Sequence, residues 1–419
     1  MFDAFTNGDT DPFGGWDLYN QGLNNLDYLI LDDIGSFGNG IGPHVGLNDL
    51  DMIVMDDVTW DMNHRHAGGR QPNVRQTPDT DRDDRNKSFA LGMDIGGTGI
   101  ASGLVEVTNP LGGNRIAYRV STKDPDKSLD PDDAIRYIAY LIEQCVIWLD
   151  KRGALLASVG IGAPGQVNIN KGQVIYAPNL GWKNVALLDG IKKALAESSI
   201  AQKVQYAKFV LANDADVALL GETTAGRAYG RQSVVVLTLG TGIGSGIMCD
   251  GKMVMNSELG HMVIDAHGRT CSCGKQGCWE QYVSATGLMR TVRLIASVET
   301  SRDNIDYASD SLTIADIFNA FIDNDNVAKH AIDEFKEHLA IGLANIADIF
   351  MPEAIIISGG LANYAKYFLP DVADKTERLM MRNPGAGSTD HGMEIMASDL
   401  LGDASILGAA NAAYYQSVH

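Results

Sequence analysis

Two glycine-rich turns, Asp94–Thr98 and Leu239–Gly244, constrain the fold of this 419-residue chain more than any other feature. Each turn separates two apolar segments, so each predicts a β-hairpin. The strands of these hairpins are expected at residues 88–95, 99–107, 233–240 and 244–251. Further strands alternating with helices follow each hairpin, which predicts two similar α/β lobes with ligands at the carboxyl ends of the strands.

The helix signals after the first hairpin support the prediction of an α/β fold. A helix is expected over about residues 131–151, because Asp130 is a good N-cap and Pro131 suits the first helical position. Cys145 lies on its apolar stripe and is expected in the core. Further strands and helices are expected at 157–165, 208–212, 214–226, 327–350, 354–358 and 403–415.

Both glycine-rich turns suit phosphate binding, because glycine lets backbone N–H groups approach an anion closely and Thr adds a hydroxyl donor. Asp94 is suited to the hydration shell of Mg²⁺. Neither turn is a Walker loop or a Rossmann fingerprint. A single such turn could be an ordinary hairpin turn, but a pair favours phosphate contacts from Gly96, Gly97, Thr98, Gly240, Thr241 and Gly242.

Asn213 and Asp214 follow an apolar strand and open a helix. A phosphoryl acceptor hydroxyl needs a carboxylate that orients it and takes its proton, and Asp214 stands where such a group is expected. The alternative is that this pair only caps the helix.

Four residues predict a closed, structural zinc site: His261, Cys271, Cys273 and Cys278. The alternatives are a reduced thiol cluster, a disulfide, or His267 as the nitrogen ligand. Glu258 and Glu280 flank the four residues, so zinc would hold two carboxylates near each other. Carboxylates accept several hydrogen bonds from sugar hydroxyls, so the same region is a candidate hexose site.

Residues 1–86 differ from the rest, with 16 Asp, 5 Arg and no Glu or Lys, against a net charge of −20 for the chain. We expect this segment to be a largely disordered extension, with apolar runs at 29–31 and 52–55 as the exceptions. The acidity argues against nucleic-acid binding. No membrane span or signal pattern is visible, which predicts a cytoplasmic location.

The ordered motifs resemble the ROK family of repressors and sugar kinases across about residues 88–415. They read DIGGT at 94–98, GAPG at 162–165, ND at 213–214, LGTGIG at 239–244, ELGH at 258–261 and CSCGKQGCWE at 271–280. CWEQYVSATGL looks most like glucokinases of actinobacterial type. Asn256 and Ser257 depart from the small residues that the family carries before its Glu-x-Gly-His motif.

The resemblance implies an actin-like (ribonuclease H-like) ATPase fold with two lobes around a nucleotide and sugar cleft. We therefore expect an extension over 1–86, a small lobe over 87–212 completed by the helix at 403–419, and a large lobe over 213–402. Family members are commonly dimers or tetramers, so self-association is expected.

The implied activity is phosphorylation of a hexose, glucose above all, by ATP with Mg²⁺, and Asp214 is the implied catalytic base. Gly359 and Gly360 would lie near the adenosine. The implied sugar ligands are Asn179, Asn213, Asp214, Glu258, His261 and Glu280, with His261 also on zinc. Alternatives are an N-acetylhexosamine kinase, a fructokinase, a polyphosphate-using glucokinase or a sugar-responsive repressor. The repressor would need a basic helix-turn-helix that the acidic N-terminus does not offer.

Overall fold

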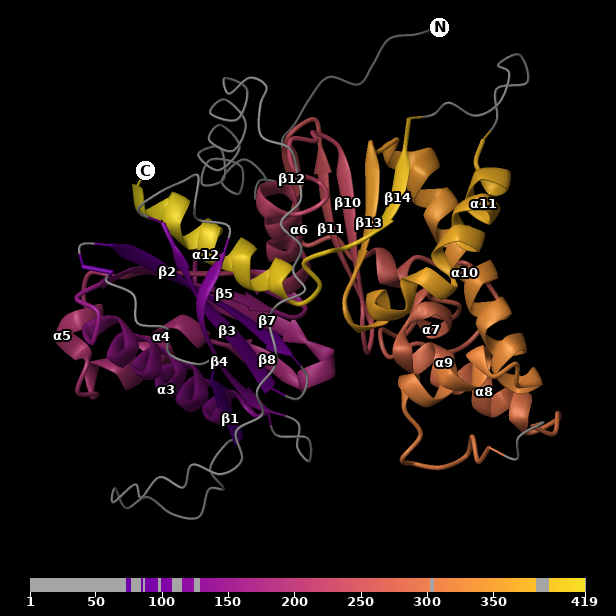
Figure 1. The fold of residues 1–419 in the computed structure, drawn as a ribbon, viewed down its shortest axis with the longest axis horizontal. Coiled ribbons are helices and arrows are strands. Elements are labelled where there is room, and N and C mark those ends of the chain that lie inside the picture. The colour runs from indigo at the N-terminus through magenta and orange to yellow at the C-terminus, as the bar shows by residue number, and fades with distance from the viewer. Residues whose placement is uncertain are drawn as a thin grey trace, which may run out of the picture.

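The structure, a computed structural model, describes residues 73–76, 84–85, 87–96, 99–107, 115–123, 129–301, 305–381 and 392–418. It has two lobes that lie side by side, each built on a β-sheet with helices against it (Figure 1). Both predicted hairpins are present, and so are the predicted helices and strands between them.

The first sheet has the strand order β1-β4-β3-β2-β5-β9. The strands β4, β3 and β2 pair antiparallel, whereas β2, β5 and β9 pair parallel. The bounds are β1 Asn73–Gln76, β2 Ser88–Gly96, β3 Gly99–Glu106, β4 Ile116–Lys123, β5 Leu155–Ala163 and β9 Lys208–Asn213. A small antiparallel sheet flanks it, formed by β6 Gln166–Asn168, β7 Gln173–Ala177 and β8 Trp182–Val185.

The second sheet repeats the same pattern in the order β12-β11-β10-β13-β14. Its strands β12, β11 and β10 pair antiparallel, and β10, β13 and β14 pair parallel. The bounds are β10 Val234–Leu239, β11 Ile243–Cys249, β12 Lys252–Val254, β13 Ala354–Ser358 and β14 Glu394–Ala397. This repetition is the two-lobe duplication that the paired hairpins predict.

The helices cover both faces of each sheet (Figure 1). None within the described ranges is long and apolar enough to cross a membrane. Their bounds are α3 Pro131–Asp150, α4 Leu187–Ala196, α5 Ala201–Val204, α6 Asp214–Ala225, α7 Glu280–Val283, α8 Ala285–Ala296, α9 Ile314–Ile322, α10 Asn326–Phe350, α11 Leu369–Leu379 and α12 Asp403–Val418, with 3₁₀-helices η1 Pro178–Leu180, η2 Leu259–His261 and η3 Gly360–Tyr367.

Local signals explain these boundaries. Asp130 caps α3 by accepting a hydrogen bond of 2.9 Å from the backbone N–H of Asp133, as its sequence position predicts. Cys145 is fully buried on the inner face of this helix. Strand β10 is apolar except for Thr238, because alternate residues face different helices: Val235 and Leu237 join the core under α8–α10, while Val236 packs with α6 residues.

Part of the segment assigned to the acidic extension belongs to the first lobe. Strand β1 pairs antiparallel with β4 and forms the edge of the sheet. Asp84 is buried; its Oδ1 lies 3.1 Å from Lys87 Nζ, and its Oδ2 lies 3.8 Å from Arg152 Nε. The Arg152 guanidinium lies over the Trp148 ring, 3.9 Å from the ring centroid. The apolar runs at 29–31 and 52–55 lie outside the described residues.

Two helices connect the lobes and pack against each other. The chain passes from β9 through α6 to β10, and it returns from β14 through α12, which lies across the first sheet (Figure 1). Glycine makes this packing possible. A Cβ on Gly160 would lie 1.8 Å from the carbonyl oxygen of Ala409, and one on Gly408 would lie 1.7 Å from that of Val217.

Replacement of Gly160 by Ala should therefore destabilise the protein, because the new methyl group meets α12 backbone that cannot move aside alone. We expect a loss of at least about 2 kcal/mol in the free energy of unfolding. Gly402→Ala is the matched control, since a Cβ there meets open space. Chemical denaturation measures both variants; equal stability of the two would contradict the close approach.

Candidate functional site

The site residues of the first lobe lie where its parallel strands end. Asp94 and Gly96 are in the last residues of β2, and Asp214 directly follows β9 as the first residue of α6. Because β2, β5 and β9 are parallel, these ends share one edge of the sheet. Gly97 and Thr98 lie outside the described residues.

Two of these carboxylates are close enough to influence each other. A Cβ on Gly162 of β5 would lie 3.6 Å from Asp94 Oδ1 and 3.5 Å from Asp214 Cα. Burial, together with the smaller effect of the nearby Asp214 carboxylate, raises the pKa of Asp94 to about 7. Burial likewise raises the pKa of Asp214, against a hydrogen bond from the N–H of Ala215. A raised pKa makes Asp214 a better proton acceptor than an exposed aspartate.

Asn213 performs the capping role that was the alternative to a ligand role for this pair. Its Oδ1 accepts from the backbone N–H groups of Ala215 at 2.8 Å and Asp216 at 3.2 Å. Its Nδ2 donates to the carbonyl of Gly165 at 2.9 Å. Asn213 is therefore the N-cap residue of α6. The Asp214 carboxylate accepts a hydrogen bond at Oδ1 from the N–H of Ala215.

The second lobe contributes a cluster of polar side chains: His261, Glu258 and Glu280. His261 Nδ1 lies 3.6 Å from Glu280 Oε1, and Glu258 lies just before η2 and influences Asp214 electrostatically. Glu280 begins α7, and the preceding Trp279 anchors it. The Trp279 ring is fully buried and donates its N–H to the carbonyl of His338 in α10 at 2.8 Å.

The second glycine-rich turn lies against this cluster of polar side chains. In the turn, Gly240 N–H donates to the carbonyl of Gly242 at 3.0 Å. A Cβ on Gly242 would lie 2.9 Å from Glu280 Oε2 and 3.6 Å from Asn179 Nδ2, so residues of both lobes converge there. Gly359 directly follows the adjacent parallel strand β13 with a φ of 80°, and a Cβ on it would lie 2.7 Å from the carbonyl oxygen of Leu239. Gly360 follows it at the start of η3.

The predicted metal ligands come together. The donor atoms of His261, Cys271, Cys273 and Cys278 all lie within 4.8 Å of one another, and His267 is not among them. Cys271 Sγ is 3.5 Å from His261 Nδ1, and Cys273 Sγ is 3.6 Å from Cys278 Sγ. Tetrahedral zinc with Zn–S bonds of about 2.3 Å needs donor separations of roughly 3.5–3.8 Å, so the residues fit the ion. All three thiols are free, which excludes the disulfide alternative.

Asp216 is a buried carboxylate that the sequence motifs do not single out. It is 1% exposed; Oδ2 accepts from the backbone N–H of Asn256 at 3.4 Å, and Oδ1 has no partner among the described residues. Asn256 Oδ1 accepts in turn from Val167 N–H of the first lobe at 3.5 Å. Ser257 Oγ donates to the carbonyl of Ser245 at 2.6 Å. The two residues that depart from the family pattern therefore hold the segment that carries Glu258.

Sequence and structure comparisons agree with this geometry. A family model described as the ROK family matches residues 90–415. The chain is 32% identical over 336 residues to a glucokinase of Thermotoga maritima, covering 77% of this chain and 96% of the relative. It is 30% identical to a glucokinase of Streptomyces coelicolor, covering 78% and 97%. A xylose repressor of Bacillus subtilis is 26% identical over 300 residues, covering 70% and 68%.

Among solved structures, a ROK family glucokinase from Streptomyces griseus in complex with glucose and AMPPNP is similar, with a TM-score of 0.64 and 28% identity. The match covers 78% of this chain and 99% of that one. The fold is the actin-like ATPase fold, with two lobes of matching topology. Within that class, the chain belongs to the ROK family.

Loss of one thiolate should release the metal. We expect Cys273→Ser to lower the zinc content of the purified protein from about one ion per chain to nearly none, and to lower its melting temperature, because a structural site contributes folding free energy. Elemental analysis with thermal denaturation tests this. Cys249→Ser, outside the cluster, is the control. Absence of zinc from the purified wild-type protein would contradict the assignment.

The buried Asp216 makes stability depend on pH. Burial, with smaller effects of Asp214 and Glu258, raises its pKa from 3.8 to about 7. The folded state thus holds a proton that the unfolded chain releases, so the free energy of unfolding falls as pH rises from about 4 to about 7. Asp216→Asn cannot ionise. Relative to wild type it should gain at least about 1 kcal/mol between pH 4.5 and pH 8 in chemical denaturation; an unchanged difference would refute the shift.

Proposed function

We propose that this protein is an ATP-dependent sugar kinase that transfers the γ-phosphoryl group of MgATP to the 6-hydroxyl of glucose. The observation that carries the proposal is the position of Asp214. Its partly buried carboxylate lies at the carboxyl edge of the first sheet, where it interacts electrostatically with Asp94 and Glu258. Phosphoryl transfer depends on positioning more than on nucleophile activation, so one oriented carboxylate suffices as the base.

The sugar would bind between Asp214 and the cluster of polar side chains of the second lobe. Glu258, His261 and Glu280 offer acceptors for hydroxyl groups, and Asn179 and Asn213 would complete the set. His261 faces Cys271 through Nδ1. Zinc bound at Nδ1 would leave Nε2 for a sugar hydroxyl, and the ion would fix the ring and the segment that carries Glu280.

The nucleotide would lie on the glycine-rich turns of both lobes. Backbone N–H groups of Gly96, Gly97 and Thr98, and of Gly240, Thr241 and Gly242, would face its phosphates, with Gly359 and Gly360 near the adenosine. Asp94 suits the hydration shell of Mg²⁺, because a cation beside it would relieve its repulsion with Asp214. Similarity over almost the whole length of two glucokinases supports the sugar, and similarity to a glucokinase structure with bound glucose and AMPPNP supports both the sugar and the donor.

A coupled assay tests the proposal directly. Purified protein is offered glucose, mannose, fructose, N-acetylglucosamine and N-acetylmannosamine, with ATP or polyphosphate as donor. We expect turnover with ATP and the highest kcat/KM for glucose. Turnover of only another sugar would show that the protein is a kinase for that sugar and not for glucose. Sugar binding without any turnover would favour the repressor function found among the relatives.

Replacement of the proposed base should remove activity and leave the fold intact. We expect Asp214→Asn to lower kcat by at least about a hundredfold, because the acceptor hydroxyl loses the group that takes its proton. Asp189→Asn, an exposed aspartate in the first turn of α4, is the control. Steady-state kinetics measure kcat, and thermal denaturation measures whether the fold is intact. A near-wild-type kcat would show that Asp214 is part of the helix but not the base.

A further inference from the structure

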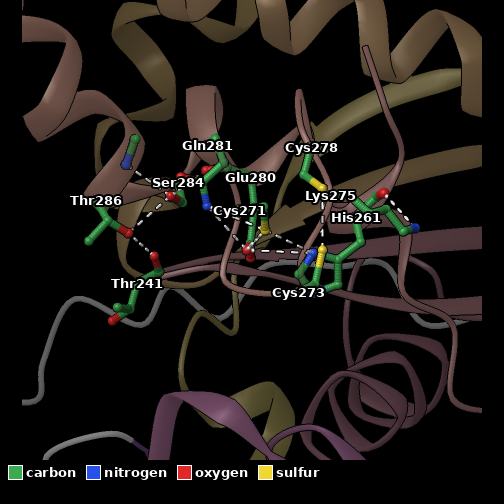
Figure 2. Close-up of polar contacts among 11 residues, drawn as sticks. Thr241, His261, Cys271, Cys273, Lys275, Cys278, Glu280, Gln281, Ser284 and Thr286 are labelled. Carbon is green, nitrogen blue, oxygen red and sulfur yellow. Dashed lines mark hydrogen bonds and ion pairs between the residues drawn. The ribbon is translucent and has the colours of Figure 1, made fainter. Parts of the chain in front are cut away.

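A line of hydrogen bonds connects the second glycine-rich turn to the cluster of polar side chains around Glu280 (Figure 2). At the turn, the Thr286 hydroxyl donates to the carbonyl of Thr241. Thr286 Oγ1 lies 3.2 Å from Ser284 Oγ, and Ser284 Oγ donates to the carbonyl of Glu280 at 2.6 Å. These contacts lie between the residues proposed for phosphate and for sugar.

The same turn is tied to α8 by a backbone contact. Ala285 N–H donates to the carbonyl of Gly240 at 2.8 Å. Ser284 caps α8 by accepting from the N–H of Gly287 at 3.0 Å, so its position is fixed by the helix. Thr286 is the second residue of α8, and it thereby joins the turn to a rigid element.

The turn lies directly against the Glu280 side chain. Gly242 lies so close to Glu280 that a Cβ on it would come within 2.9 Å of Oε2. Glu280 Oε1 in turn lies 3.3 Å from Cys271 Sγ and accepts from Gln281 Nε2 at 3.5 Å (Figure 2). The carboxylate therefore lies between the turn on one side and the cysteine cluster on the other.

The two hydroxyl groups have one proton each but three oxygen contacts to serve. With Ser284 donating to Glu280 and Thr286 donating to Thr241, the contact between the two hydroxyl groups holds no proton. If Thr286 donates to Ser284 instead, the carbonyl of Thr241 loses its side-chain donor. Thr286 thus offers two hydrogen-bond states, one that adds a side-chain restraint on the turn and one that removes this restraint.

We infer that Thr286 is a positioning residue that couples nucleotide binding at the Gly240–Gly242 turn to sugar binding at Glu280. A nucleotide phosphate on the turn favours the restrained state, in which Gly242 and Glu280 keep the arrangement that receives the sugar. Each ligand therefore raises the affinity for the other by the same factor. The inference rests on the proposed kinase function and adds to it a role for the Thr286 hydroxyl.

The test compares Thr286→Val, which loses the hydroxyl at almost constant shape, with Thr286→Ser, which keeps it. Isothermal titration measures the affinity for glucose with and without saturating AMPPNP and Mg²⁺. In wild type we expect AMPPNP to raise the affinity for glucose about tenfold. Thr286→Val should lose most of that factor, and Thr286→Ser should retain it. Thr300→Val, an exposed threonine after α8, is the control and should behave as wild type.

The outcomes separate this inference from the function on which it rests. If wild type phosphorylates glucose but shows no coupling, or if Thr286→Val keeps the full factor, the coupling role is refuted and the kinase function stands. A loss in Thr286→Ser equal to that in Thr286→Val would also refute it, because the hydroxyl would then be irrelevant. If wild type phosphorylates no sugar in the panel, the proposed function fails and the inference fails with it.

Discussion

The close packing of α12 against the first sheet and against α6 is the constraint on which the rest of the structure depends. Four glycines make it possible, two in the sheet and one in each helix: Gly92, Gly160, Gly221 and Gly408. A Cβ on any of them would lie 2.0 Å or less from a backbone carbonyl oxygen of the facing element. Because α6 and α12 are also the two connections between the lobes, this contact sets how the strand ends of both lobes face each other.

The arrangement gathers negative charge at the point where the lobes meet. Asp94, Asp214 and Asp216 are all buried enough to raise the pKa of their carboxyl groups, and Glu258 adds its field. In a folded protein such crowding costs stability, and burial without partners costs more. It is the electrostatic setting in which a cation and polar hydroxyl groups bind well, which accounts for its place at a candidate phosphoryl-transfer site.

Much of this could be predicted from the sequence. The paired glycine-rich turns predict the duplicated hairpins, and Asp130 predicts the start of α3, because both signals are local. The cysteine spacing predicts the cluster, and the structure selects His261 over His267. The motifs could not show that Asn213 rather than Asp214 caps α6, since either residue suits that position. Nor could they reveal the contacts of Asp216 with Asn256 and of Thr286 with Thr241, because these contacts join segments far apart in the chain.

The central claim is that the strand ends of the two lobes form one site that delivers a phosphoryl group to a sugar and not to water. Phosphorus NMR of a reaction containing the full chain, MgATP and glucose tests it most directly. We expect a sugar phosphomonoester signal, at the position of glucose 6-phosphate, that grows as fast as the γ-phosphate signal of ATP falls. Release of inorganic phosphate alone, or an unchanged ATP spectrum with fully zinc-loaded protein, would contradict it.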